Sequence, residues 1–353
     1  MTDATVASTQ GWRVQPNAPL RASNTFGVAC TAPWLLEIYN PRALPTALNA
    51  SPISRHALLP LGAGSNILFV EDPKVCIVQC KNQEIQINAH HNDADLIYVG
   101  AGCCWHRFVL WALHHEYAGI ENLALIPGTV GASVVQNIGA YGVQVAPFVH
   151  SVCAYDTLSR DFVAFSPADC AFGYRDSLFI HTQGRYLIYG VVFRLPYQHP
   201  LQLDYPGITA TLAQHKVTKP TPRSVAQAVI AIRQHKLPDP QKLGNAGSFF
   251  KNPLLSRDIC LALQQRYPSI PVYPVDAQTS KLSAAWLIEA CGWKGQRHGQ
   301  AGVYAQHALV LVNYGNATGR EIYTLARQIA HSVHCQFGVQ LQPEPRIIGA
   351  TWE

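Results

Sequence analysis

A serine in the stretch GNAGSFFKNP, residues 244–253, is the first candidate for chemistry, because it lies between a glycine and two phenylalanines. Ser248 has no G-x-S-x-G context and no visible Ser-His-Asp arrangement, so a hydrolase nucleophile is unsupported. A neutral hydroxyl can still donate a proton to a strongly basic carbon centre that forms in a reaction. Ser248 is therefore either a turn residue or a proton donor beside an electron-rich intermediate.

Two charged residues lie in restricted surroundings. Arg175, in FGYRDSLF, could bind a carboxylate at two points through its planar guanidinium, or it could simply pair with Asp176. Glu344, in PEPRIIG, has a proline on each side, and these prolines would present its carboxylate in a fixed direction. A surface ion pair with Arg346 is the alternative reading of that motif.

Two glycine-rich stretches could approach a phosphate through their backbone N–H groups. Neither is a GxGxxG fingerprint or a Walker loop, so a standard dinucleotide fold and an NTPase are poorly supported. Structural tight turns are one reading, but two such loops beside β-rich runs favour a cofactor that carries a pyrophosphate. The stretches are LPLGAGSNILF, with Gly62 and Gly64, and IPGTVGASVVQNIGAYG, with Gly128, Gly131, Gly139 and Gly142.

Composition narrows the class of protein. The chain has 353 residues, 48% hydrophobic and 13% charged, which indicates a folded protein with room for two or three domains. Neither a signal peptide nor a membrane span is visible, so a soluble cytoplasmic protein is expected. The net charge of +5 is dispersed, which argues against nucleic acid and fits an anionic small molecule better.

The metal-binding patterns that we considered are missing from the sequence. The ten cysteines form no CxxC pair and no His/Cys cluster at zinc spacing, and the fifteen histidines form no HExxH motif or i, i+4 pair with a carboxylate. We therefore expect reduced, mostly buried thiols and no metal ion.

Hydrophobic periodicity predicts the elements that must position these residues. The runs CIVQC, IQINA and DLIYVGAG read as strands, and HALVLVN reads as a buried strand near the C-terminus. A proline-rich excursion is expected between Pro196 and Pro222, and the alternating VQLQ would complete a compact C-terminal α/β unit. Three apolar helix faces are predicted. The first consists of Trp105, Phe108, Val109, Ala112 and Leu113, with a stop at Gly119, and the second consists of Val225, Ala228, Val229 and Ile232. The third follows a Thr318/Glu321 capping box and consists of Ile322, Leu325, Ala326, Ile329 and Val333, before Gly338.

The motifs in order resemble one family, the UDP-N-acetylenolpyruvoylglucosamine reductases (MurB) of bacterial peptidoglycan synthesis. The similarity covers nearly the whole chain past Ser23, and the proline-rich excursion favours the longer, type I enzymes. It runs through NTFGV, LGAGSNILF, IPGTVGASVVQNIGAYG, FGYRDSLF, KLPDP, GNAGSFFKNP, KLSAAWLIEACGWKG and PEPRIIGA.

The resemblance implies an α+β fold, in which a two-part FAD-binding domain of the vanillyl-alcohol-oxidase (PCMH) type is followed by a smaller α+β substrate-binding domain. We expect a polar N-terminal segment at residues 1–18, the FAD-binding domain at 19–195 and the excursion with a linker helix at 196–243. The C-terminal domain with its returning tail is expected at 244–353. FAD should be noncovalent, because GAGSN contains no histidine or cysteine.

The resemblance also implies a reaction and its residues. NADPH reduces FAD, and hydride then passes to the vinyl carbon of UDP-N-acetylglucosamine enolpyruvate. Arg175 stabilises the resulting enediolate-like charge, Glu344 orients the carboxylate or relays a proton, and Ser248 protonates the carbanionic carbon.

The remaining site residues follow from the same motifs. Where related type I enzymes commonly have glutamine, this chain has His307, so the contact from that position is in doubt. The resemblance implies cofactor contacts at Gly62, Gly64, Ser65, Asn66, Gly128, Thr129, Gly131, Ala132, Asn137, Gly139, Ala140, Tyr141 and Gly142, and substrate contacts at Tyr174, Tyr205, Lys236, Asn252, Tyr273 and Lys281.

Two other functions stay open on the sequence alone. An oxidase of the same flavin fold would use the glycine loops in the same way, need no serine donor and react readily with oxygen. A flavoprotein that only binds nucleotide sugars or partner proteins is the noncatalytic alternative. The resemblance itself suggests a monomer without nucleic-acid or membrane partners.

Overall fold

The computed structural model describes residues 11–205 and 207–352, and contacts divide this part of the chain into two compact units. The first unit comprises the residues up to Ala18, Ala32–Ala63 and Lys74–His235. The second comprises Pro19–Thr31, Gly64–Pro73 and the residues from Lys236 onward. This grouping differs from the boundaries expected from sequence, because two short segments of the first half pack with the C-terminal third. Of the expected polar segment, residues 1–10 lie outside the described part, and a strand follows them from Trp12.

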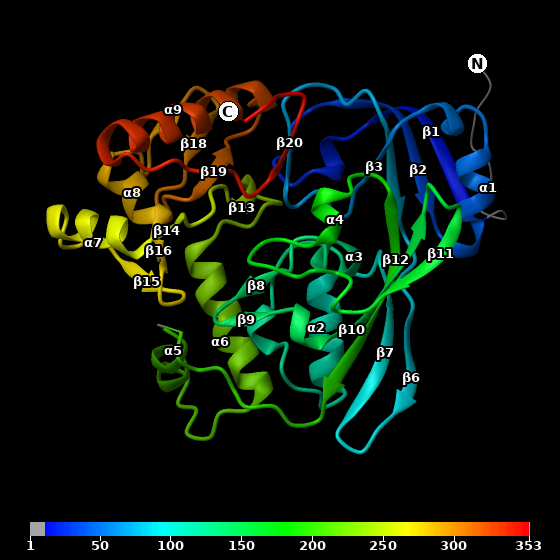
Figure 1. Ribbon diagram of the computed structural model, residues 1–353, viewed down its shortest axis with the longest axis horizontal. Helices are drawn as coiled ribbons and strands as arrows, with labels where there is room; N and C mark the ends of the chain where they lie inside the picture. The colour runs from blue at the N-terminus through cyan, green and yellow to red at the C-terminus, as the bar shows by residue number, and fades with distance from the viewer. Residues whose placement is uncertain (1–10, 206, 353) are drawn as a thin grey trace. The chain divides into compact units, whose positions relative to one another are not determined.

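One sheet of the first unit has the order β1-β2-β5-β3 (Figure 1). β2 and β3 both run parallel to β5, whose side chains are mostly buried, as is usual for strands inside a parallel sheet. Helix α1 (Leu44–Asn49) buries Leu44 and Ala47 in a hydrophobic core that they share with side chains of β2 and β5. The strands are β1 (Trp12–Pro19), β2 (Thr31–Ile38), β3 (Leu58–Pro60) and β5 (Cys76–Cys80).

The second sheet of the first unit is antiparallel, with the order β11-β10-β12-β7-β6. The expected strands at residues 76–80, 85–89 and 95–102 are confirmed as β5, β6 and β7. The strands are β6 (Ile85–His90), β7 (Ala94–Gly100), β10 (Val149–Asp156), β11 (Asp161–Phe165) and β12 (Tyr186–Pro196), and a separate short pair is β8 (Gly139–Ala140) and β9 (Val143–Gln144).

Helix α2 (Trp105–His114) covers this sheet with the apolar face that periodicity predicts. All five predicted face residues are buried, and the rings of Trp105 and Phe108 contact Phe193 of β12 at centroid distances of 6.0 and 4.9 Å. The helix ends at His114, before the expected stop at Gly119. The short helices α3 (Val130–Ser133) and α4 (Leu178–His181) belong to the same unit.

The proline-rich excursion contains a short helix that periodicity did not reveal. Helix α5 (Ile208–Gln214) buries Ile208 and Leu212 in the core of the first unit, so two apolar side chains suffice to fix it. Helix α6 (Pro222–Lys236) follows, and its predicted face of Val225, Ala228, Val229 and Ile232 is buried in that core.

The second unit combines three sheets with three helices around one core (Figure 1). Its sheets have the orders β13-β19-β18-β17, β14-β16-β15 and β20-β4. The strands are β4 (Ile67–Phe69), β13 (Gly244–Ser248), β14 (Leu254–Ser256), β15 (Val272–Pro274), β16 (Thr279–Leu282), β17 (Arg297–His298), β18 (Ala301–Val303), β19 (Val310–Asn313) and β20 (Arg346–Ile348); the helices are α7 (Arg257–Arg266), α8 (Ala284–Ala290) and α9 (Gly319–Phe337).

Helix α9 has the start, the buried face and the stop that the sequence predicts. Thr318 and Glu321 form the capping box, and Gly338 ends the helix with a left-handed φ of 69°. The VQLQ segment after it alternates in burial, with Val339 and Leu341 buried, but it is not a strand.

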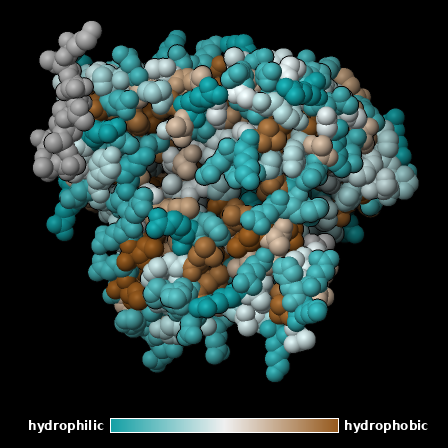
Figure 2. Space-filling model, turned by 180° about the vertical axis from the view of Figure 1, so that it is seen from behind, coloured by the Kyte–Doolittle hydropathy of each residue, from teal (hydrophilic) through white to brown (hydrophobic). Residues whose placement is uncertain are grey.

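No helix among the described residues is both long enough and apolar enough to cross a membrane. The face seen in Figure 2 is largely hydrophilic, with apolar residues gathered in patches in its lower half. All ten cysteines are free thiols: five are buried, four are partly buried, and Cys335 is exposed.

The capping box gives a test of how α9 is stabilised. Replacing Thr318 by alanine removes the hydroxyl that accepts from the Glu321 N–H at 3.2 Å, and we expect a loss of about 1 kcal/mol in the free energy of unfolding. Thr324→Ala is the matched control, since this threonine is exposed in the same helix, where alanine is the stronger helix former. Thermal unfolding followed by circular dichroism measures both. Equal destabilisation by the two variants would contradict the cap.

Acid should weaken the same cap. Hydrogen bonds from the backbone N–H and the hydroxyl of Thr318 lower the pKa of Glu321. The stabilisation is therefore present above the ordinary pKa of the carboxyl and declines as pH falls through its lowered value. We expect the difference in stability between the native chain and Thr318→Ala to shrink on acidification. A difference that grows towards acid pH would contradict this.

Candidate functional site

Ser248 lies at the end of β13, where the strand is interrupted by a bulge. The pairing with β19 shifts register between Asn245 and Ser248, and Gly247 takes a left-handed φ of 70°. A bulge of this kind bends the strand and changes the direction of the next side chain. Ser248 is only partly buried, whereas Phe249 and Phe250 are fully buried. The serine thus occupies the edge of an apolar core.

The C-terminal tail holds Glu344 against the end of β13. The Glu344 N–H donates to the Phe249 carbonyl at 2.8 Å, and the Lys251 N–H donates to the Gln342 carbonyl at 2.9 Å. The Asn66 side-chain amide also donates to the Glu344 carbonyl at 3.1 Å. Two residues predicted to act together, Ser248 and Glu344, therefore belong to neighbouring backbone segments of the second unit.

Trp352 supports both of these segments, and the motifs did not reveal it. Its ring packs on Phe249 and Phe250 at centroid distances of 6.5 and 5.9 Å, and its indole N–H donates to the Leu341 carbonyl at 3.2 Å. The Arg327 guanidinium lies 5.2 Å from the ring centre. An isolated tryptophan near a chain end carries no spacing signal that would place it here.

Arg175 belongs to the first unit, where its backbone is left-handed, with a φ of 54°. Its guanidinium donates from Nη2 to the Gly139 carbonyl at 2.7 Å and lies 5.8 Å from the centre of the Tyr174 ring. The carboxylate of Asp176 lies 2.8 Å from Nε2 of His181 and accepts from the Ser177 N–H. The arginine is therefore held beside the second glycine stretch by its own side chain.

Two further predicted residues share this unusual backbone. Asn137 and Tyr141 have φ values of 46° and 51°, in a region that non-glycine residues seldom occupy. The Asn137 amide N–H donates to the Gly173 carbonyl at 3.0 Å, which links the second glycine stretch to the Arg175 loop. Left-handed non-glycine residues concentrate at functional sites, so their grouping supports a site at this place.

The glycine stretches meet within the first unit. A Cβ atom on Gly62 would lie 2.7 Å from Oγ1 of Thr129 and 3.1 Å from Cβ of Ala132. A Cβ atom on Gly131 would lie 2.6 Å from Cβ of Ala101. Only residues without side chains allow these approaches, so backbone from two distant stretches forms one surface. This glycine cradle fits a phosphate-bearing cofactor.

The end of the first glycine stretch belongs to the second unit. A Cβ atom on Gly64 would lie 2.0 Å from the Ser23 carbonyl oxygen, and the Gly64 carbonyl accepts from the Thr25 N–H at 3.0 Å. The Asn66 carbonyl accepts from the Arg346 N–H at 3.0 Å, next to the parallel pairing of β4 with β20. Gly64 is therefore required by packing, whatever else it binds.

The predicted substrate residues of the second unit lie on and beside its three-stranded sheet. Tyr273 and Lys281 are direct cross-strand partners of β15 and β16, so their side chains lie on the same face. Asn252 accepts through Oδ1 from the Ala284 N–H at 3.0 Å and so holds the start of α8. The structure thus brings Tyr273 and Lys281 together and gives Asn252 a structural contact.

In the first unit, Tyr205 contacts the second glycine stretch. Its ring lies 4.8 Å from that of Tyr141, edge to face. Buried Asn122, which the motif analysis missed, donates to the carbonyls of Tyr141 and Gln202 at 2.8 and 2.9 Å. This amide ties the glycine stretch to the excursion that carries Tyr205.

Arg233 is a second missed residue of the first unit. Its Nε donates to the Leu125 carbonyl at 3.2 Å, and its side chain also binds the Tyr141 hydroxyl group. Burial and the nearby positive charge of Arg175 lower the pKa of Arg233, although a guanidinium stays protonated. The positively charged side chains of Arg175 and Arg233 therefore both lie near the second glycine stretch. The sequence signal that could have indicated Arg233 is its position beside Ile232, at the edge of a predicted buried helix face.

His307 lies among charged groups of the second unit. Burial and the positive charges of Lys236 and Lys294 lower its pKa, while Glu289 opposes this. Nδ1 accepts from the Leu309 N–H at 3.2 Å, so a neutral ring carries its proton on Nε2. His307 is therefore a neutral hydrogen-bond donor near Lys236, which is a predicted diphosphate contact.

Comparison with known proteins gives two family models in chain order. Residues 36–161 match the FAD binding domain, and residues 239–348 match the C-terminal domain of UDP-N-acetylenolpyruvoylglucosamine reductase. The glycine cradle lies in the first match, and Ser248 and Glu344 lie in the second. The predicted α+β fold with an FAD-binding domain is confirmed.

Relatives match along nearly the whole chain. Proteins named UDP-N-acetylenolpyruvoylglucosamine reductase from Xylella fastidiosa (strain M12) and Xanthomonas euvesicatoria pv. vesicatoria (strain 85-10) are 54% and 55% identical over 346 and 343 residues. These cover 98% and 97% of this chain and 99% and 98% of the relatives.

A solved structure agrees at the level of fold. The UDP-N-acetylenolpyruvylglucosamine reductase (MurB) of Thermus caldophilus superposes with a TM-score of 0.66 at 22% identity, covering 96% of this chain and 99% of that one. Together with relatives that exceed half identity along almost the full length, this shows that the chain belongs to the UDP-N-acetylenolpyruvoylglucosamine reductase (MurB) family.

Proposed function

We propose that this FAD-dependent reductase uses NADPH to reduce UDP-N-acetylglucosamine enolpyruvate to UDP-N-acetylmuramate, with Arg175, Ser248 and Glu344 as its catalytic residues. Membership of the family establishes the reductase class. The observation that carries the catalytic assignment is the bulge at Ser248, which sets a hydroxyl at the edge of a buried aromatic core beside the Glu344 segment.

Ser248 is the proton donor. When bound, FAD supplies the hydride that adds to the vinyl carbon of the substrate. Electrons then accumulate on the adjacent carbon, which becomes basic enough to take a proton from a neutral hydroxyl. Phe249 and Phe250 keep the serine backbone in one place, so the proton reaches one face of that carbon and sets the stereocentre.

Arg175 and Glu344 act on the substrate carboxylate. A planar guanidinium can bind both oxygens of a carboxylate, and its charge stabilises the enediolate-like state most strongly. The bond to the Gly139 carbonyl fixes one edge of the Arg175 fork before substrate arrives. Glu344, held by its own backbone, orients the reacting group or relays a proton.

The glycine cradle is the proposed site for the FAD pyrophosphate, bound noncovalently. Gly62 and the stretch from Gly128 to Gly142 form this cradle in the first unit. Gly64, Ser65 and Asn66 are proposed as further FAD contacts. Lys236, Tyr273 and Lys281 are proposed to bind the nucleotide diphosphate, with Asn252, Tyr174 and Tyr205 as further substrate contacts.

We also propose that the protein works in the cytoplasm and as a monomer, as the resemblance to the family suggests. The domain boundaries at residues 19, 196 and 244 are retained as a proposal for how the FAD-binding and substrate-binding parts divide.

Removing the Ser248 hydroxyl should separate the two halves of the reaction. For Ser248→Ala we expect flavin reduction by NADPH to stay within about twofold of the native rate, while reoxidation by the enolpyruvyl substrate slows by roughly 10²- to 10⁴-fold. Stopped-flow absorbance resolves the two steps. Ser248→Cys is the matched control, since a thiol can still donate a proton and should recover part of the rate. Equal slowing of both halves would remove Ser248 from the donor role.

Changing the shape of the Arg175 cation should also slow turnover. For Arg175→Lys we expect turnover to fall at least about 100-fold, because an ammonium cannot reproduce the planar fork. Arg160→Lys is the matched control, since Arg160 also has a left-handed backbone, with a φ of 59°, but lies at the turn between β10 and β11. Steady-state oxidation of NADPH measures both. Near-native turnover of Arg175→Lys would leave Arg175 with a structural role only.

A further inference from the structure

We propose that His331 and Cys335 form a binding site for a thiophilic divalent cation, with Zn²⁺ as the best match. The two residues are one turn apart on the exposed side of α9, and Nε2 of His331 lies 3.4 Å from Sγ of Cys335. The sequence predicts no His/Cys cluster at the spacing of a zinc motif, and this His-x-x-x-Cys pair is smaller than such a cluster. The site lies outside the proposed catalytic residues.

The distance between the two donor atoms suits one tetrahedral ion. With Zn–S and Zn–N bonds of about 2.3 and 2.0–2.1 Å, two ligands of a tetrahedral zinc are about 3.5 Å apart. The observed separation is close to this value without any change of the backbone. A bound ion would replace the hydrogen bond between the two side chains. Imidazole and thiolate together favour zinc over calcium or magnesium, which prefer oxygen.

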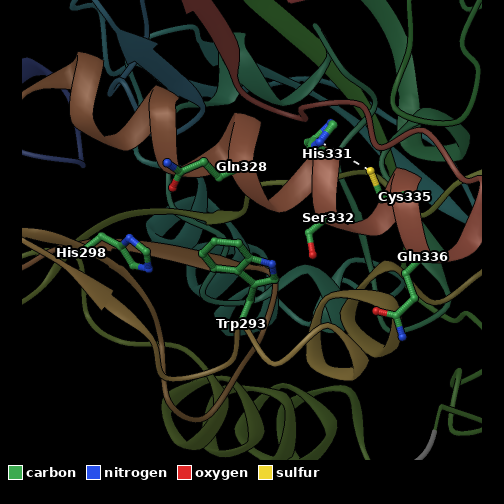
Figure 3. A pocket seen from close by; sticks show the side chains of 7 residues that line it. All are labelled: Trp293, His298, Gln328, His331, Ser332, Cys335 and Gln336. Atoms are coloured by element: carbon green, nitrogen blue, oxygen red, sulfur yellow. Dashed lines mark hydrogen bonds between the residues drawn. The ribbon is translucent and has the colours of Figure 1, made fainter.

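The pair lines an open cavity of about 680 Å³, in which solvent can complete the coordination (Figure 3). Ser332 and Gln336 of the same helix line this cavity, and Trp293 and His298 form another part of its wall. Figure 3 shows His331 and Cys335 close together along α9, with His298 on the far side of Trp293. The cavity therefore gives an ion access and leaves room for water ligands.

The position in the helix also favours a cation. Cys335 lies two residues before the last residue of α9, where helix carbonyls create negative potential. The same potential attracts a divalent cation to the side chains of this last turn.

The other cysteine thiols are poorer zinc ligands than Cys335. Cys335 is the exposed member of the ten cysteines. Burial raises the pKa of Cys30, Cys76 and Cys170 to about 12, so these thiols do not ionise near neutral pH. Cys291 is nearer to the site, but its Sγ donates to Oε1 of Gln336 at 3.2 Å and burial raises its pKa.

The site has two protein donors, which limits its affinity. Among the residues that the structure describes, no three histidine, cysteine or carboxylate side chains come together as a metal cluster. Water must fill the remaining positions, so this is a reversible site rather than a structural zinc, which has four protein ligands. Its occupancy should follow the free zinc concentration.

The test is calorimetric titration of tag-free, flavin-loaded full-length protein with ZnCl₂ under metal-free reducing conditions. We expect one zinc ion per chain, and Cys335→Ser or His331→Ala should each weaken binding at least about 10-fold. Zinc should also protect one thiol from a disulfide reagent in the native chain, and this protection should disappear in Cys335→Ser.

Two neighbouring residues provide controls for the same titration. His334→Ala removes an exposed imidazole from the same turn, and Cys291→Ser removes the thiol that contacts Gln336, so both should keep the native affinity. Circular dichroism of each variant confirms that α9 is intact. Native affinity in both Cys335→Ser and His331→Ala, or loss of binding only in a control variant, would overturn the proposal. Absence of zinc binding by the native chain would overturn it as well.

Discussion

Two backbone hydrogen bonds hold the C-terminal tail against the end of β13, and the proposed catalytic chemistry depends on them. They join Glu344 to Phe249 and Lys251 to Gln342. Breaking them would leave polar backbone groups unsatisfied beside buried phenylalanine rings, which costs more than an exposed hydrogen bond. Trp352 covers the same place from the end of the chain. The tail is therefore held beside Ser248, although it lies far from Ser248 in sequence.

Local patterns predicted the helices well and the long-range arrangement poorly. The buried faces of α2, α6 and α9 and the Thr318 cap follow from spacing within one or two turns, which a sequence shows directly. The grouping of Pro19–Thr31 and Gly64–Pro73 with the C-terminal third depends on pairings such as β4 with β20, which no local pattern contains. Helix α5 escaped prediction because only two apolar residues anchor it.

The sequence motifs supply the residue types of the proposed site, but they do not contain its backbone geometry. Glycines at 62 and 131 were expected for a phosphate, and the structure adds that a side chain on Gly62 would collide with the second stretch and one on Gly131 would collide with Ala101. The bulge before Ser248 and the left-handed φ of Arg175 arise from packing and appear in no motif. Arg233 and His307 interact with residues that are remote in sequence, Arg233 with Tyr141 and His307 with Lys236.

The proposed enzyme carries electrons from NADPH to an enolpyruvyl ether through bound flavin. The most direct measurement is anaerobic: the native protein is reduced with NADPH, mixed with UDP-N-acetylglucosamine enolpyruvate, and followed at roughly 450 nm, where oxidised flavin absorbs. We expect rapid return of the oxidised spectrum with formation of UDP-N-acetylmuramate. A flavin that stays reduced with this substrate, yet is reoxidised readily by oxygen, would exclude the reductase activity and favour an oxidase.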